Sequence, residues 1–311
     1  MGSRLETLNG ALWPRPLTVI KMETIDRKSD FGQIYAELFT SMQELYDVCG
    51  QREARGFDAG DRLSPNYKCR DPDWAGFKDG TSLKDDAFSG RIDPSIIQPI
   101  ITSTNKLHAV KGARVGVVHD VMGFQPDVNA VLNGEPEYML AVRHTPRPGR
   151  VIRLFINLGA HCGVSSSTMN AAGSALIETV AGMEISGQYR LEIYVGDSFA
   201  RQPLYAVGVR IKTASQPMNI ARMAWPMVNS SAFSRGIAFG WYNRTPKKVR
   251  ELSGYGAPWS GTDYGLRREF KKEMRARGLT VLGISDIIEW VKNGRDIETA
   301  ILDEIKEANS L

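Results

Sequence analysis

The stretch VIRLFINLGAHCGVSSSTMNAAGSALIETVAGM, residues 151–183, decides the fold class. Its first ten residues form a nearly continuous apolar run, which is typical of a strand buried on both faces. A Gly- and Ser-rich turn follows, and then a helical stretch with a serine at the N-cap and small residues on one face. A strand, a turn and a helix in this order form the repeating unit of an α/β layer.

Further strands and helices alternate on both sides of this stretch. The sequence predicts other strands in RVGVVHD (114–120), YMLAVRH (138–144), YRLEIYV (189–195), LYAVGVRI (204–211) and LTVLGI (279–284). Helical patterns occur near residues 128–132, 218–228, 266–278 and 296–308. We therefore predict an α/β fold whose mainly parallel sheet is flanked by helices.

Residues 1–110 have a different character and are predicted to form a helical, loop-rich N-terminal extension. Asp30 and Gln33 have the spacing of a capping box, and apolar residues recur at helical spacing from there to about Cys49. A second helix is expected near Asp93, cut or kinked by Pro99. Residues 50–110 hold few apolar side chains, so we expect the extension to wrap an α/β core formed by residues 111–311.

Composition argues against a membrane-spanning or secreted protein. None of the apolar runs in the 311 residues approaches the roughly 18–20 residues needed to span a bilayer. The first residues lack the apolar region of a secretory signal. The three cysteines, Cys49, Cys69 and Cys162, form no close pair, which indicates a reducing compartment. These features predict a cytoplasmic protein with no membrane partner.

Motifs of enzymes are missing from the chain. Phosphate-binding glycine motifs, HExxH and GxSxG do not occur. His161 and Cys162 are adjacent, and we expect neighbouring residues not to reach hydrogen-bond geometry with each other. Glu135 and Glu137 are interpreted as solvated carboxylates of a turn. We therefore predict no catalytic residues, no metal site, no cofactor and no enzymatic activity.

Positive charge is concentrated in residues 235–277, named here the basic-aromatic segment. Eleven basic and four acidic residues give this segment a net charge of +7, whereas the whole chain carries +4. Aromatic side chains alternate with the cations, as in WYNRTPKKVR at residues 241–250. Cations neutralise phosphates without reading sequence, and exposed aromatic rings stack on unpaired bases. This mixture favours a single strand over a duplex.

The candidate binding residues follow from this pattern. Predicted phosphate contacts are Arg244, Lys247, Lys248, Arg250, Arg267, Arg268, Lys271 and Lys272. Predicted stacking residues are Trp241, Tyr242, Tyr255, Trp259 and Tyr264. The competing interpretation is a solvated or protein-binding face in which an aromatic such as Trp241 anchors the core.

The stretches VVHDVMGFQPDVNAVLNGEPEYML and 151–183 also resemble a family of phage and mobile-element proteins with a degenerate von Willebrand A-like core. In such cores a strand ends in Asp-x-Ser-x-Ser and binds a divalent ion. Asn157, Gly159 and His161 occupy the matching positions here, so the resemblance implies that the metal site is lost. Within the family, length and charge are most similar to the single-stranded-DNA-binding RNA polymerase cofactors of schitoviruses. That resemblance implies recruitment of a phage-encoded RNA polymerase to middle promoters.

The sequence suggests three alternative functions. The favoured one is a single-stranded-DNA-binding transcription cofactor. The second is a protein–protein adaptor with a von Willebrand A-like core and no nucleic-acid binding. The third, a hydrolase or nucleotide-binding enzyme centred on residues 157–167, ranks lowest because the carboxylates are missing. The sequence does not determine the oligomeric state, and a homo-oligomer is one of the alternatives.

Overall fold

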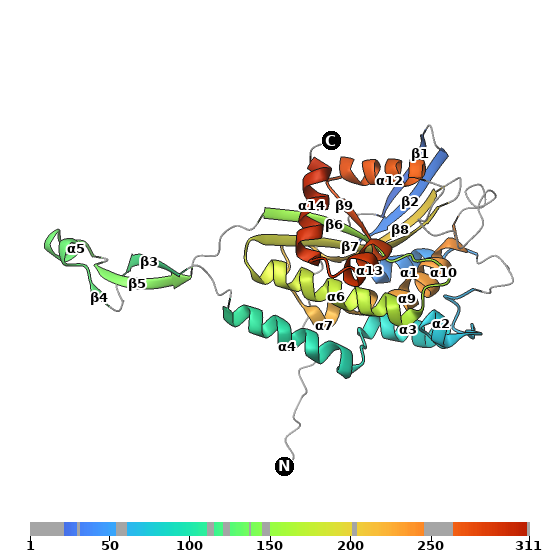
Figure 1. The fold of residues 1–311 in the computed structure, drawn as a ribbon, viewed down its shortest axis with the longest axis horizontal. Helices are drawn as coiled ribbons and strands as arrows, with labels where there is room; N and C mark the ends of the chain where they lie inside the picture. The colour runs from blue at the N-terminus through green and yellow to red at the C-terminus, as the bar shows by residue number, and fades with distance from the viewer. Residues whose placement is uncertain are drawn as a thin grey trace, which may run out of the picture.

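A six-stranded sheet forms the centre of the protein in the computed structural model (Figure 1). The structure describes residues 22–29, 32–53, 61–110, 115–120, 125–136, 138–144, 150–200, 204–245 and 264–309. The strands of this sheet are β1 (Glu23–Ser29), β2 (Gly32–Phe39), β6 (Arg150–Asn157), β7 (Tyr189–Ala200), β8 (Leu204–Lys212) and β9 (Thr280–Gly283), in the order β1-β2-β8-β7-β6-β9. β2–β8, β6–β7 and β6–β9 pair in parallel, and β1–β2 and β7–β8 pair antiparallel. The predicted α/β class with a mostly parallel sheet is thus confirmed.

The helix predicted from Asp30 was wrong over residues 32–39, which form strand β2. Ile34 and Leu38 face one side of the sheet and Tyr35 faces the other, and all three are buried. A strand that is buried on both faces has apolar residues at odd and even positions. Some of these residues are then three or four positions apart, so the run also matches the spacing of a helix. The helix α1 (Met42–Gly50) begins later, where the Ser41 side chain accepts a hydrogen bond from the Glu44 amide at 3.1 Å.

Most helices cover one face of the sheet. The long helix α6 (Ser166–Ile185) lies across it, and α4 (Pro94–Val110), α13 (Ile284–Lys292) and α14 (Ile297–Asn309) pack against α6. The shorter elements are α2 (Pro72–Ala75), α3 (Gly80–Ser89), α7 (Ile220–Met223), α8 (Trp225–Val228), α9 (Ser230–Ala232), the π-helix η1 (Phe233–Ala238) and α10 (Phe239–Tyr242). A Cβ on Gly173 of α6 would lie 1.8 Å from the Met227 carbonyl oxygen. The small residues of α6 therefore permit close approach of α8.

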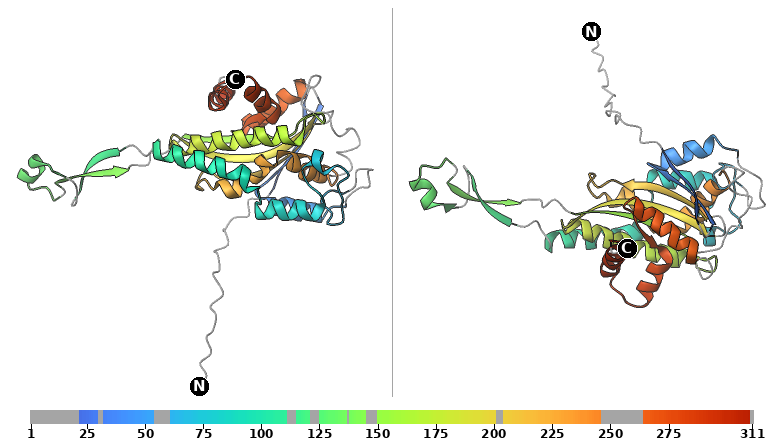
Figure 2. Two further views of the ribbon diagram at one scale, coloured as in Figure 1. Left: turned by 60° about the horizontal axis from the view of Figure 1, so that its bottom comes forward. Right: turned by 90° about the horizontal axis from the view of Figure 1, so that it is seen from above.

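Among the described residues, one helix, α12 (Tyr264–Ala276), covers part of the opposite face (Figure 2). Its Phe270 packs edge-on against Phe155 of β6, with ring centroids 5.5 Å apart. Phe155 in turn lies over Gly196 and Gly208, where a Cβ would come within 2.4–2.7 Å of its ring. Helix α12 is thereby fixed over the middle of the sheet, and the other described helices leave further parts of this face uncovered.

Residues 115–144 form a separate arm. Its strands β3 (Val115–Asp120), β4 (Gln125–Pro126) and β5 (Met139–His144) make a three-stranded sheet in the order β3-β5-β4, and α5 (Val128–Leu132) lies at its end. Strands β3 and β5 and the short helix were predicted, but as part of the α/β core, and β4 was not predicted. Figures 1 and 2 show the arm projecting beyond the end of α4, away from the main sheet. Pro99 lies inside α4, which continues past it to Val110.

Candidate nucleic-acid interface

The start of the basic-aromatic segment, residues 235–245, is buried and is named here the anchor half. Trp241 is fully buried, and its indole Nε1 donates to a carboxylate oxygen of Glu37 at 2.7 Å. Tyr242 is also buried, with its ring edge-on to Tyr205 at 5.4 Å between centroids. The prediction that Trp241 and Tyr242 stack on bases was wrong, because neither ring face reaches the surface.

Glu37 explains why Trp241 lies in the core. This carboxylate is fully buried on β2 and accepts two hydrogen bonds from the Arg52 guanidinium, at 2.8 and 2.9 Å. The Tyr35 hydroxyl donates a third at 2.5 Å, and burial together with the Glu37 charge raises the pKa of Tyr35. The indole of Trp241 completes the set. A buried carboxylate is tolerated only when it is paired in this way.

Both arginines of the anchor half also have internal partners. The Arg244 guanidinium pairs with Asp61, Nη2 to Oδ2 at 2.5 Å, and donates to the Cys49 carbonyl. Arg235 lies over the Trp74 ring at 4.1 Å from its centroid and donates to the Val164 carbonyl at 2.5 Å. Arg244 was predicted to contact phosphates; its guanidinium instead joins α10 to the loops that follow α1.

Five predicted contact residues, Lys247, Lys248, Arg250, Tyr255 and Trp259, lie outside the described residues. Tyr264 is the first residue of α12. The remaining predicted residues, Arg267, Arg268, Lys271 and Lys272, are on α12, in residues 264–277, named here the exposed half.

Two of the four α12 cations predicted to bind phosphates are used internally. Arg267 donates to both carboxylate oxygens of Asp286 on α13, at 2.8 and 3.0 Å. Lys271 pairs with Glu304 on α14 at 3.1 Å. These ion pairs hold α12 to the two C-terminal helices.

The other cations of α12 face solvent. Arg268 and Lys272 are exposed, Arg275 is partly exposed, and none of the three has a hydrogen-bond or ion-pair partner among the described side chains. Positions i, i+4 and i+7 lie on one side of a helix, so these charges form a row about 10 Å long. Glu269 also lies on α12 and reduces the net charge of this row. An exposed row of unpaired cations is suited to a polyanion.

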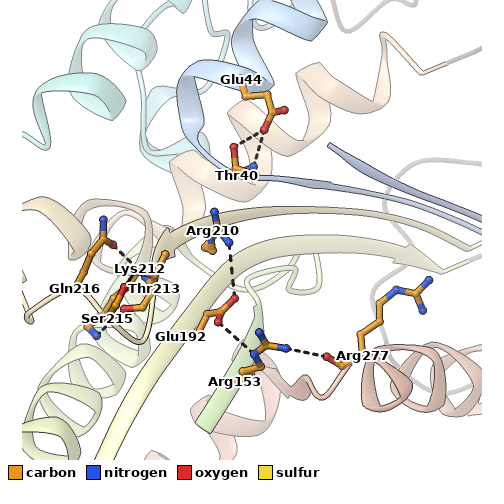
Figure 3. Close-up of polar contacts among 10 residues, drawn as sticks. All are labelled: Thr40, Glu44, Arg153, Glu192, Arg210, Lys212, Thr213, Ser215, Gln216 and Arg277. Carbon is orange, nitrogen blue, oxygen red and sulfur yellow. Dashed lines mark hydrogen bonds and ion pairs between the residues drawn. The ribbon is translucent and has the colours of Figure 1, made fainter. Parts of the chain in front are cut away.

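Two further arginines, Arg153 and Arg210, lie on the sheet face that α12 partly covers. Arg153 on β6 donates to the Arg277 carbonyl at 3.5 Å and to Glu192 on β7 at 3.2 Å. Glu192 also lies 4.0 Å from Arg210 on β8, and Figure 3 shows these side chains in a row across three strands. The Glu192 carboxylate lies between two guanidiniums, so Arg153, Glu192 and Arg210 together keep a net positive charge. Arg153, Arg210, Arg268, Lys272 and Arg275 together are named here the basic strip.

A groove of about 420 Å³ lies at the end of the basic strip, and Arg210 belongs to its wall. It opens where β2 and β8 end side by side and α1 begins (Figure 3). Its lining is formed by Thr40, Ser41, Arg210, Ile211, Lys212, Thr213, Gln216, Pro217, Asn219 and Met223. Ser41 caps α1, and Glu44 accepts from the Thr40 amide and hydroxyl at 2.7 and 2.8 Å, so these groups already have internal partners. The lining is mixed, with polar side chains beside the apolar Ile211, Pro217 and Met223.

Arg153, Arg210 and the groove were missed by sequence reasoning. Each arginine lies within an apolar run, VIRLFIN or LYAVGVRIK, that indicates a buried strand. An isolated cation in such a run was the available signal. This signal alone does not show an open strand face, because Lys212 in the second run is fully buried and pairs with Glu184 at 2.8 Å.

The corner that resembles a von Willebrand A metal site is closed by internal hydrogen bonds. The Asn157 side chain accepts from the Gly159 and Ser198 amides at 3.2 and 3.1 Å and donates to the Ser198 hydroxyl at 3.0 Å. Beside it, burial raises the pKa of Asp197 to about 7, although the Ser234 hydroxyl donates to its carboxylate at 2.5 Å. A Cβ on Gly159 would lie 2.1 Å from Asp197 Oδ1. Within the described ranges, no three His, Cys, Asp or Glu side chains gather as metal ligands.

His161 and Cys162 follow this corner on the surface. Their Sγ and Nδ1 atoms are 3.9 Å apart, so the expectation that adjacent residues would not approach this closely was wrong. The His161 Nδ1 accepts from the Gly163 amide at 3.0 Å, which bends the turn and brings the two side chains together. Of the two turn glutamates, Glu135 is exposed after α5, and Glu137 lies outside the described residues.

A family described as a domain of unknown function (DUF7192) matches residues 18–277, which is more than half of the chain. The match includes the arm, the anchor half and α12. No curated protein and no solved structure matches the chain. None of the helices in the described ranges is both long and apolar enough to cross a membrane.

Proposed function

The chain belongs to the DUF7192 family, and from its own residues we propose that it binds single-stranded nucleic acid, DNA in the first place, without sequence preference. The binding surface is the basic strip, extended by the cations and aromatics of residues 246–263. No metal, cofactor or catalytic residue takes part.

The row formed by Arg268, Lys272 and Arg275 carries this proposal. Other described cations of the segment tie elements of the fold together through internal partners, and these are Arg235, Arg244, Arg267, Lys271 and Arg277. The three unpaired cations make no such connection, and keeping three positive charges near one another on one helix is unfavourable without a partner. Phosphates are the partner that such a row attracts.

The preference for a single strand is supported by the groove and the remaining aromatics. A groove of about 420 Å³ beside Arg210 can receive a base or nucleoside only when that base is not in a duplex. Tyr255 and Trp259 supply further stacking faces in the proposal. Tyr194 on β7 lies on the same sheet face as α12. Its side chain packs against the buried core under α12, and this burial raises its pKa.

The wider role that we propose is that of a transcription cofactor that brings a phage-encoded RNA polymerase to single-stranded promoter DNA. This part is supported by the sequence resemblance to the schitovirus cofactors. It predicts that a polymerase and a single strand bind the chain at the same time.

The proposal is tested by fluorescence anisotropy with a labelled single strand and the matching duplex, at about 50 and 200 mM salt. We expect tighter and salt-sensitive binding to the single strand. The triple variant R268A/K272A/R275A should lose most of this affinity. The matched control is R70A/K78A/K84A, which removes three exposed cations on the α2–α3 side, across the sheet from α12.

Two results would contradict the proposal. Equal loss of affinity in the two triple variants would mean that net charge alone attracts the strand. No binding of the wild-type chain at low salt would remove the nucleic-acid function altogether and leave the adaptor function as the better explanation.

A further inference from the structure

The tip of the arm exposes apolar side chains that the fold does not cover. Val128, Val131 and Leu132 of α5 are 66, 46 and 79% exposed, and Tyr138 beside them is 40% exposed. Only Ala130 of this helix is buried. These four exposed residues, named here the tip surface, are half of the large hydrophobic side chains exposed among the described residues. Such a concentration at the end of a projecting arm marks an interaction site.

The tip surface is also acidic. Residues 121–142 contain Asp127, Glu135 and Glu137 and no lysine or arginine. The Asp127 side chain caps α5 by accepting from the Asn129 amide at 3.0 Å, whereas Glu135 is exposed and has no partner among the described groups. A partner of this surface should therefore combine an apolar groove with a positive charge at its edge.

The body of the same protein has a groove of this kind. It lies between α6 and α13, has a volume of about 270 Å³, and is lined by Ser167, Thr168, Ala171, Ala172, Ile288, Val291 and Lys292. The small residues of α6 form its floor, and Val291 is 46% exposed in its wall. Lys292 at its edge is exposed and has no ion-pair partner in the part of the chain that the structure describes.

We propose that the tip surface of one copy docks into the α6–α13 groove of a second copy. Val128 and Leu132 are spaced i and i+4, so they lie on one side of α5 and enter an apolar groove together. Glu135 then faces Lys292. Figures 1 and 2 place the tip beyond the end of α4, away from α13, so the contact joins two chains.

The two surfaces are different parts of the molecule, and this decides the form of the assembly. A contact between unlike patches adds copies in an open row, or closes into a ring where the rotation between copies returns to the first one. The protein therefore assembles head to tail, and growth needs no nucleic acid. Several copies in a row would align their basic strips along one strand.

Sedimentation velocity on nucleic-acid-free protein tests the proposal. Wild-type chain should pass from the 34.5 kDa monomer to species larger than a dimer as concentration rises. L132D places a charge on the tip surface, and V291D places a charge in the α6–α13 groove. Each variant should stay monomeric on its own. An equimolar mixture of the two should form dimers and nothing larger, because it holds one working tip and one working groove.

Charge reversal gives a second test in which misfolding cannot imitate the expected result. E135K and K292E should each shift association to at least tenfold higher concentration, and the double variant E135K/K292E should regain much of it. V151D, which places aspartate at another exposed valine, should assemble like the wild type.

Three outcomes would overturn the proposal. The wild type could stay monomeric at every concentration, V291D could assemble like the wild type through tip-to-tip contact, or the mixture of L132D and V291D could form no dimer.

Discussion

The anchor half and the exposed half of the basic-aromatic segment both combine cations with aromatic rings, yet they have opposite structural roles. In residues 235–245, Trp241 and Arg244 face inward onto Glu37 and Asp61. In residues 264–277, Phe270 and Met274 face inward, while Arg268 and Lys272 face solvent. The difference lies in the acids available nearby: the anchor half meets carboxylates of the N-terminal elements, and part of α12 meets none. Charge density alone therefore does not identify a binding surface, and the proposed interface rests mainly on the α12 cations that have no internal partner.

The largest expected effect is on stability, in the anchor half. Trp241→Ala removes a fully buried indole and leaves the buried Glu37 with one hydrogen bond fewer. We expect the free energy of unfolding to fall by about 3–5 kcal/mol, measured by urea denaturation. Trp241→Phe keeps most of the ring and should cost less. A change below about 1 kcal/mol for Trp241→Ala would contradict its place in the core.

Asp197, beside the anchor half, should make stability depend on pH. Burial raises its pKa in the folded state to about 7 from an ordinary value near 3.8. The folded chain therefore binds this proton more tightly than the unfolded chain, and the resulting stabilisation is present below about pH 4 and lost as pH rises through about 7.

Asp197→Asn should remove this dependence. We expect the variant to gain on the order of 2–4 kcal/mol relative to the wild type at about pH 8, and little at about pH 4. Thermal unfolding of both proteins across this range gives the comparison. A gain at the acidic end as large as that at the alkaline end would show that Asp197 does not titrate in this window.

Trp259→Ala tests whether Trp259 has a different role from the buried Trp241 of the same segment. If Trp259 stacks on a base, its removal should cost about 1–3 kcal/mol of binding, or roughly 5- to 150-fold in Kd, with stability unchanged. Anisotropy and urea denaturation on the same sample separate the two effects. Stability loss without affinity loss would assign Trp259 to the core, as for Trp241.

The sequence predicted the framework of the fold better than the interface. Strands β6, β7, β8 and β9 were predicted because each is a short apolar run bounded by turns. β2 was missed because a strand buried on both faces can imitate helical spacing. Trp241 could not be assigned to the core in the same way, since its partner Glu37 is 204 residues away in the chain. Arg153 and Arg210 have the same difficulty, because only the sheet order shows that Glu192 lies between them.

The smallest expected effect tests whether the exposed half touches the strand or only attracts it. Arg268→Ala and Lys271→Ala each remove one positive charge from α12, but Lys271 is already paired with Glu304. A phosphate contact on a single strand contributes about 0.7 to the slope of log K against log salt. Arg268→Ala should therefore flatten the slope by about 0.7 and leave the free energy of unfolding within about 0.5 kcal/mol of the wild type. Lys271→Ala should leave the slope nearly unchanged, because no phosphate contact is lost. Equal slopes in the two variants would mean that α12 acts through its overall field, and that the contrast between paired and unpaired cations does not define the interface.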